Sequence, residues 1–392
     1  MLTPKEQIND KYKFLAEEEI VTYVKKNKLF DEQEKVSVVE ISDGKINHVY
    51  RLFGEKRTMI YKQAVPYART VGESMPLPLD RVRIEAKVLQ EYNKILPGSA
   101  PEVLHLDEEM AIVLTEDLAP MKMGRLALIK GEGTDRFASD VGIFSATTIF
   151  YTSDFYLSPI EKKEKNASLT NSGMRELTED LVFTKPFNFD ESNFYEKELK
   201  NDVLFLSRDE RLRLEVAKLK HKFMTKADAL IHSDLHSGSI FIDNERTAIF
   251  DTEFACFGPF GFDLGQFIAN LYLNGIGSPK FLTKRYNESL ETWYAFTDTF
   301  SRLWKTESND PNTLIDGYLT DVLKEIFADM IGYAGCELIR RSIGIAQIDD
   351  LNHEQDEQLR IQRRKKCVDL GKHLILERHN ISTLEELKSW FI

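Results

Sequence analysis

The sequence contains few cysteines, no long apolar run and no excess of positive charge. Its three cysteines, Cys256, Cys336 and Cys367, are too widely spaced for a disulfide framework or a zinc ribbon, so we expect a reduced, cytoplasmic protein. No run of about 18 apolar residues occurs, which predicts that the chain has no membrane span. Lys and Arg total 52 against 64 Asp and Glu, for a net charge of −12. This balance argues against general binding to nucleic acids or anionic membranes, so we expect neither as a partner.

The order of predicted elements indicates two unequal lobes within the 392 residues. The N-terminal part reads β-β-β-α-β-β, with strands expected over 36–41, 48–53, 58–64, 102–105 and 111–115, a loop around Pro66, Pro76 and Pro78, and a helix capped by Asp80 that runs to about Ile95. Beyond it, a β patch at 229–250 lies among helical patterns at 135–151, 209–229, 313–334 and 357–378. We therefore predict an α+β fold, with a small antiparallel β lobe over 1–116 that carries one main helix, and a larger, mainly helical lobe over 117–392.

The most informative segment is IHSDLHSGSIFIDNERTAIFDTEF, residues 231–254. Asp234 follows an apolar strand in this segment. Two short strands, 239–243 and 247–250, are joined by a turn and predict a hairpin. We expect this hairpin to return Asp251 toward the loop that carries Asp234.

Carboxylates in this pattern are typical of phosphoryl transfer. One carboxylate orients the attacking hydroxyl, and others hold Mg²⁺ against the phosphate oxygens. The pattern predicts Asp234 as the catalytic residue and Asp251 as a metal ligand. An extended chain after Asp251 would point Glu253 to the same side, so Glu253 is a second expected ligand. Ser239 stands where protein kinases carry asparagine and is a weaker candidate ligand.

Two other interpretations of the segment are open. It could be a polar hairpin in which an aspartate only caps a turn. Alternatively, His232, Asp234 and His236 could be metal ligands of a hydrolase. The other six histidines have no partners at ligand spacing, and a hydrolase site leaves the β-rich lobe unexplained.

A strand lysine is the expected phosphate-binding residue of the N-terminal lobe. Lys62, in MIYKQAV, is the candidate, although a lysine on a strand is by itself more often an ordinary surface residue. In kinases such a lysine pairs with a glutamate on a helix. Glu85 in DRVRIEAKVL is the expected partner, with Glu73 in the preceding loop as a second choice.

Two further segments are candidates for contact with a nucleotide. The turn at 42–47, SDGKIN, has one glycine where protein kinases have three, and Asn47 is its best candidate for a phosphate contact. At the junction of the lobes, the backbone of Thr115, Glu116 and Asp117 could hydrogen-bond adenine.

Six blocks of the sequence resemble the bacterial and plant 5-methylthioribose kinases, which belong to the protein-kinase-like superfamily with the aminoglycoside and choline phosphotransferases. In chain order, the blocks are KQAVPYARTVGES, PLDRVRIEA, ELTEDLVFTKPF, LIHSDLHSGSIF, FGPFGFDLGQFIANL and GCELIRRSIG. The resemblance implies a bilobal protein-kinase-like fold and a homodimer. It also implies ATP-dependent phosphorylation of the 1-hydroxyl of 5-methylthioribose, a step of methionine salvage.

The resemblance also implies roles for single residues. Asp234 is the catalytic acid and contacts the sugar; Asp251 and Glu253 hold Mg²⁺; Asn47, Lys62 and Thr115–Asp117 bind ATP; and Arg341, with Arg340 beside it, contacts the substrate. Without the resemblance, the two arginines would be interpreted as a solvated helix end, where adjacent side chains diverge.

Four positions depart from the family pattern. Met75 replaces the usual tryptophan of the VGESWPL loop, Ser42 and Ser233 replace glycines, and Thr252 replaces proline or alanine between the two acids. Met75 is the most consequential, because a flexible thioether takes the place of a rigid ring. It motivates an alternative, a kinase of the same fold with another small pentose, amino-alcohol or aminoglycoside-like acceptor. A nucleotide-binding protein with a degraded site is a third interpretation, which the intact acids and lysine disfavour.

Overall fold

A computed structural model of the chain describes residues 11–41, 46–69 and 71–392. Contacts divide the chain into two compact units. The first is formed by Met1–Pro120, Asn171–Met174 and Phe250–Phe254, and the second by Met121–Thr170, Arg175–Ile249 and Ala255–Ile392. Two short segments beyond the predicted division at residue 116 thus make their contacts with the first unit. One of them carries Asp251 and Glu253.

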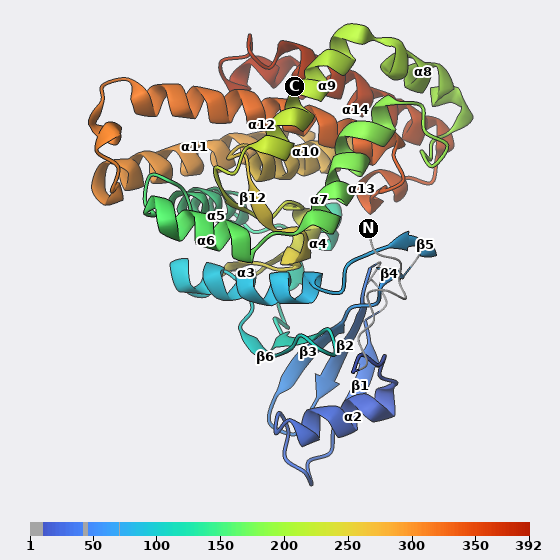
Figure 1. The fold of residues 1–392 in the computed structure, drawn as a ribbon. Helices are drawn as coiled ribbons and strands as arrows, with labels where there is room; N and C mark the ends of the chain where they lie inside the picture. Colours follow the sequence, from blue (N-terminus) through green and yellow to red (C-terminus); the bar gives the residue numbers. More distant parts are fainter. Residues whose placement is uncertain (1–10, 42–45, 70) are drawn as a thin grey trace. The chain divides into compact units, whose positions relative to one another are not determined.

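An antiparallel sheet forms the centre of the first unit (Figure 1). Its strands are β1 (Ser37–Glu40), β2 (His48–Phe53), β3 (Thr58–Gln63), β6 (Val103–Asp107) and β7 (Ile112–Glu116), hydrogen-bonded in the order β1-β2-β3-β7-β6. Helices α2 (Glu17–Lys26) and α3 (Arg81–Ile95) cover opposite faces. Alternate residues of β7 show this, because Leu114 packs in the core that contains α2 and Val113 in the core that contains α3. The small antiparallel sheet with one main helix is confirmed.

Two local expectations for the first unit need correction. Asp80 holds the N-cap position of α3, which ends at Ile95 as predicted, but it makes no capping hydrogen bond, and its carboxylate instead accepts two hydrogen bonds of 2.6 Å from Arg83. The stretch expected as a loop contains a short strand pair, β4 (Tyr67–Ala68) with β5 (Gly72–Pro76). Met75 lies in β5 and is partly buried. Of the predicted phosphate turn at 42–47, residues 42–45 lie outside the described residues.

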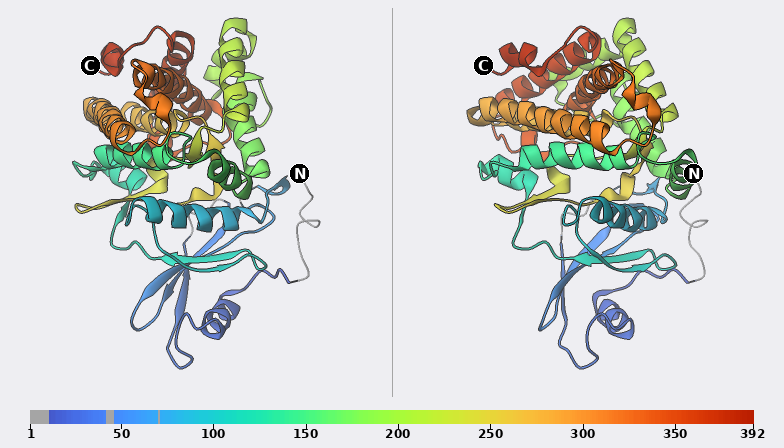
Figure 2. Two further views of the ribbon diagram at one scale, coloured as in Figure 1. Left: turned by 60° about the vertical axis from the view of Figure 1, so that its left-hand side comes forward. Right: turned by 90° about the vertical axis from the view of Figure 1, so that its left-hand side faces the viewer.

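Helices dominate the second unit (Figure 2). They are α4 (Gly124–Lys130), α5 (Phe137–Tyr151), α6 (Pro159–Ser168), the part of α7 (Ser172–Thr178) from Arg175 on, α8 (Lys200–Arg208), α9 (Glu210–Thr225), α10 (Phe262–Gly277), α11 (Leu282–Glu307), α12 (Tyr318–Ile343), α13 (Asp349–Asn352) and α14 (Glu357–Glu377). The helices α5 and α11 lie side by side, and α12 packs against α10 and α14. None of the helices in the described residues is long and apolar enough to cross a membrane.

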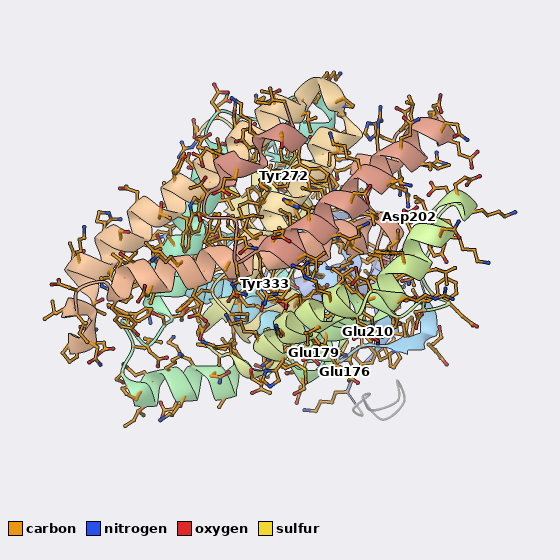
Figure 3. All side chains as sticks on the ribbon, turned by 90° about the horizontal axis from the view of Figure 1, so that it is seen from above. Glu176, Glu179, Asp202, Glu210, Tyr272 and Tyr333 are labelled. Carbon is orange, nitrogen blue, oxygen red and sulfur yellow. The ribbon has the colours of Figure 1, made fainter. Side chains whose placement is uncertain are left out.

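Helix α10 is the most buried helix of this unit, since all of its residues are buried. Figure 3 shows Tyr272 of α10 and Tyr333 of α12 among the crossing helices, while Asp202 and Glu210 lie on helices at the edge. Both tyrosines are fully buried. Its polar residues recur at helical spacing along one stripe and are buried with the apolar ones: Asp263, Gln266, Asn270 and Asn274. Neither α10 nor α11 was among the predicted helices.

A hairpin carries the chain out of the second unit toward Asp251. Strands β10 (Ile240–Ile242) and β11 (Thr247–Ile249) pair antiparallel, which confirms the predicted hairpin. β8 (Lys122–Met123) pairs with β10, and β9 (Ala229–Ile231) pairs with β12 (Cys256–Gly258). The extended chain expected after Asp251 is wrong, because a 3₁₀ turn, η5 (Thr252–Phe254), follows it directly and Asp251 itself has φ of 64°.

Candidate active site

The first unit contains a buried lysine surrounded by carboxylates. Lys62 lies on β3 and is 8% exposed. Its Nζ is 3.0 and 2.8 Å from the two oxygens of Glu85 on α3 and 2.5 Å from Asp251 Oδ1. Glu253 Oε1 lies 3.9 Å from the same nitrogen. The structure thus brings these four predicted residues together, and Glu85 rather than Glu73 is the helix partner of the lysine.

A buried arginine holds Glu253 from behind. Arg81, in the first turn of α3, is fully buried, and its Nε lies 3.2 Å from Glu253 Oε2. Its Nε and Nη2 also donate to Asn47 Oδ1, at 3.2 and 2.7 Å, while Asn47 Nδ2 donates to Glu253 Oε2 at 2.7 Å. Both ends of the Asn47 amide are therefore used inside the protein. Sequence reasoning did not single out Arg81, although its i,i+4 spacing from Glu85 places the two on one helix face.

Acidic groups outnumber basic ones in this cluster. Burial acts to lower the pKa of Lys62, but the carboxylates of Asp251, Glu253 and Glu85 raise it overall, so the ammonium form persists. Burial also raises the pKa of Glu85, against the opposing effect of Lys62. Carboxylate oxygens are the protein ligands that Mg²⁺ takes in nucleotide sites. The Asp251 side chain is 44% exposed and that of Glu253 is 2% exposed, so the pair fits a divalent cation that approaches from the side of Asp251.

In the second unit, the loop after β9 places Asp234 among nitrogen donors. Asp234 Oδ1 lies 3.2 Å from Arg341 Nη2 and 3.7 Å from Arg340 Nη1, and Oδ2 lies 3.4 Å from His236 Nε2. Burial acts to raise the pKa of Asp234, but His236 and the two arginines hold it well below its usual range. The carboxylate is therefore ionised at neutral pH, where it can orient a hydroxyl group.

A buried glutamate explains why two adjacent arginines converge on Asp234. Glu337 is fully buried one turn earlier on α12. Its Oε2 lies 3.0 Å from Arg340 Nη1 and its Oε1 lies 2.5 Å from Arg341 Nε. Both arginines are 6% exposed, so the interpretation as a solvated helix end is wrong. The sequence signal that sequence reasoning missed is the spacing E-x-x-R-R, which puts the acid at i−3 and i−4.

A third guanidinium joins the same network. Arg125 on α4 has Nε 2.9 Å from Asp350 Oδ2, and its Nη2 donates to Asn270 Oδ1 at 3.1 Å. Asn270, on α10, also donates to Glu337 Oε1 at 3.3 Å. Sequence reasoning did not find Arg125, because its partners lie more than a hundred residues further along the chain.

Ser239 has a local structural role. Its hydroxyl donates to the carbonyl groups of Asp234 and His236, at 3.1 and 2.9 Å, and accepts from the His236 amide at 2.9 Å. It thereby closes the turn that follows Asp234.

The alternative metal site of His232, Asp234 and His236 does not occur. The residues that the structure describes contain no group of three or more His, Cys, Asp or Glu able to hold a metal ion.

The segment predicted to meet adenine is the end of β7. The Glu116 amide donates to the Glu102 carbonyl at 2.8 Å. The Asp117 side chain is 2% exposed and lies 3.0 Å from Arg51 Nε. These contacts fix the end of the strand, and a backbone contact of Thr115–Asp117 with adenine stays a prediction.

Comparisons with known proteins identify the family of the chain. The profile of the Phosphotransferase enzyme family matches residues 37–295. A methylthioribose kinase of Geobacillus sp. (strain WCH70) is 43% identical over 383 residues, which cover 97% of this chain and 96% of that protein. A methylthioribose kinase of Bacillus cereus (strain AH187) is 43% identical over 365 residues, 93% of either chain. The chain belongs to the methylthioribose kinase family.

A solved structure extends the likeness to the fold. A choline kinase from Cryptosporidium parvum Iowa II aligns with a TM-score of 0.51 at 14% identity, over 95% of this chain and 99% of that chain. At such identity the likeness concerns the fold alone. Together with the family profile, it confirms the predicted protein-kinase-like fold.

One departure from the methylthioribose kinase pattern leaves backbone strain beside Asp234. The two oxygens of Asp263 accept hydrogen bonds from the backbone amides of His232 and Ser233, at 2.6 and 2.8 Å, and so fix this loop. Ser233 has φ of 67°, in the left-handed region that favours glycine. The glycine of the family pattern meets this requirement without cost, whereas a residue with a Cβ does not.

We expect Ser233→Gly to raise the free energy of unfolding by about 1 kcal/mol. A left-handed conformation costs a non-glycine residue about 1–2 kcal/mol, and the greater freedom of glycine in the unfolded chain offsets part of that gain. Urea unfolding measures the change. Ser237→Gly is the matched control, because Ser237 is equally buried and is not among the residues with positive φ. The control should lose stability, and equal losses in the two variants would contradict the strain argument.

Proposed function

We propose that the chain transfers the γ-phosphoryl group of ATP to the 1-hydroxyl of 5-methylthioribose, giving 5-methylthioribose 1-phosphate and ADP in methionine salvage. Residues 1–116 would bind the nucleotide, and residues 117–392 would supply the catalytic residue and the residues that bind the sugar. A cytoplasmic location and a homodimer belong to the same proposal. The three cysteines, which are free and buried, fit a reducing compartment.

The observation that carries this proposal is sequence identity to methylthioribose kinases over nearly the whole chain. The charged residues expected in the active site are also present and paired. The 43% identity to the Geobacillus protein spans 97% of this chain. Lys62 has its glutamate, the two acids lie beside it, and Asp234 has its arginines. This set disfavours a nucleotide-binding protein without turnover.

In the first unit, Lys62 would bind the phosphates of ATP, held in place by Glu85. Asp251 and Glu253 would hold Mg²⁺, which when bound neutralises charge on the phosphate oxygens. Arg81 and Asn47 keep Glu253 oriented, so Asn47 would support the metal site, and its contact with ATP stays a prediction.

In the second unit, Asp234 would accept a hydrogen bond from the 1-hydroxyl of the sugar and align its oxygen with the γ-phosphorus. Because the transition state is loose, the hydroxyl keeps its proton until late, and a carboxylate of low pKa can still receive it. Arg340 and Arg341 would contact the sugar hydroxyls and fix the orientation of Asp234.

A coupled assay of ADP release tests the proposal. The enzyme with Mg·ATP is given 5-methylthioribose, ribose, choline or an aminoglycoside in parallel reactions. We expect strong turnover with 5-methylthioribose alone. Turnover only with another acceptor would support ATP-dependent phosphoryl transfer but refute 5-methylthioribose as the substrate. That result would agree with the replacement of the family's tryptophan by Met75. Absence of turnover with every acceptor, with ATP still bound, would overturn the proposed activity.

A further inference from the structure

His236 is a buried titratable residue beside Asp234 for which the proposed mechanism has no role. Its Nδ1 accepts a hydrogen bond from the Gly238 amide at 3.0 Å. In a neutral ring the proton therefore sits on Nε2, the nitrogen that lies 3.4 Å from Asp234 Oδ2. The side chain is 12% exposed, so little water competes for this contact.

The charged surroundings of His236 favour its neutral form. Burial lowers the pKa of the ring, and Arg125 and Arg341 lower it further, although Asp234 acts to raise it. The charged and titratable groups that face this pair come from its own loop and from α4, α10 and α12: His232, Arg125, Asp263, Glu337, Arg340 and Arg341. The ring is thus a neutral donor whose tautomer is set by the Gly238 amide.

We propose that His236 is a positioning residue, whose Nε2–H holds Asp234 Oδ2 so that the carboxylate presents a fixed orientation to the acceptor hydroxyl. Arg341 contacts the other oxygen, Oδ1, at 3.2 Å. The carboxylate is then fixed at both oxygens, which limits the directions from which a hydroxyl can donate to it. This inference rests on the proposed function for its catalytic consequence.

Two variants can distinguish a positioning role of His236 from a purely structural role. Through Nδ1, His236 also caps the short 3₁₀ turn η4 (Ser237–Ser239). The amide oxygen of asparagine can reach the position of Nδ1, and the amide nitrogen of glutamine can reach that of Nε2. His236→Asn therefore keeps the cap and loses the donor to Asp234, whereas His236→Gln keeps the donor and loses the cap.

We expect His236→Asn to lower kcat with 5-methylthioribose roughly 10²-fold, as misplaced catalytic groups do, with the KM for Mg·ATP unchanged. His236→Gln should retain kcat within about 10-fold, because its donor remains. His221→Asn, the same change on an exposed part of α9, is the matched control and should be without effect. The acid limb of the pH profile of kcat/KM should move to higher pH in His236→Asn alone, since a lost donor to the carboxylate raises the pKa of Asp234.

Two NMR measurements test the arrangement without any acceptor. The ¹⁵N shifts of the His236 ring should report a proton on Nε2. The ¹³C titration of the Asp234 carboxyl should report a higher pKa in His236→Asn than in His236→Gln. A proton on Nδ1, a kcat of His236→Asn within twofold of the wild type, or equal losses in the two variants would overturn the inference. If the wild type gives no ADP with 5-methylthioribose, the proposed function fails, and the NMR results alone decide the role of His236.

Discussion

Asp234→Ala is expected to lower kcat by roughly 10³-fold or more while the protein still binds Mg·ATP. The variant loses the group that orients the acceptor hydroxyl and the group that takes its proton, because one carboxylate does both. It also removes one of the two acids that Arg340 and Arg341 share, and Glu337 still pairs with each of them. The coupled ADP assay gives kcat, and nucleotide titration gives the affinity for Mg·ATP.

Two comparisons make this result specific to the catalytic role. Asp234→Asn keeps the volume of the side chain and should lose activity nearly as completely, since an amide cannot accept the proton. Glu245→Gln removes an acid from the exposed turn of the β10–β11 hairpin and should leave kcat unchanged. Near-normal turnover of Asp234→Ala would refute the catalytic assignment. If Asp234→Ala is mostly unfolded under the assay conditions, its loss of activity would point to a structural role instead.

The elements that sequence patterns predicted are those whose pattern is local. Strand β2 occupies the alternating segment 48–53, and α3 ends at Ile95, where its pattern ends. α10 was missed although its polar residues, Asp263, Gln266, Asn270 and Asn274, recur at helical spacing. α11 has an ordinary amphipathic pattern, so its sequence could have predicted it. The pair β4 and β5 is too short for alternation to indicate a strand.

A similar limit applies to the site. Asp234 and Asp251 stand in one motif whose spacing singles them out, and Lys62 becomes a candidate only together with that motif. The residues that support the site do not belong to motifs. Arg81 contacts Glu253 from 172 residues away in the sequence, and Arg125 contacts Asn270 from 145 residues away. No local pattern records such partners. The contacts of Arg340 and Arg341 with Asp234 were not predicted for another reason. Adjacent side chains on a helix ordinarily diverge, and here the buried Glu337 pairs with both.

Asp251→Asn is expected to raise the Mg²⁺ concentration needed for half-maximal activity by about 10–100-fold and to lower kcat at limiting Mg²⁺. Loss of a residue that merely supports a metal ligand costs about that much affinity, so loss of a ligand should cost at least as much. Asparagine suits the position because the backbone there has φ of 64°, which asparagine tolerates better than most residues. Lys62 keeps two carboxylate neighbours in the variant, Glu85 and Glu253. A small change in thermal stability should therefore accompany the large change in Mg²⁺ requirement.

Glu253→Gln separates metal binding from packing, because the two acids differ in burial. The Glu253 side chain is 2% exposed and accepts hydrogen bonds from Asn47 and Arg81, whereas that of Asp251 is 44% exposed. Neutralising Glu253 leaves the fully buried Arg81 without its carboxylate, so stability should fall together with Mg²⁺ affinity. Neutralising Asp251 should lower Mg²⁺ affinity alone. An unchanged Mg²⁺ titration of Asp251→Asn would refute its role as a ligand. Equal losses of stability in the two variants would mean that Asp251 matters chiefly as a partner of Lys62.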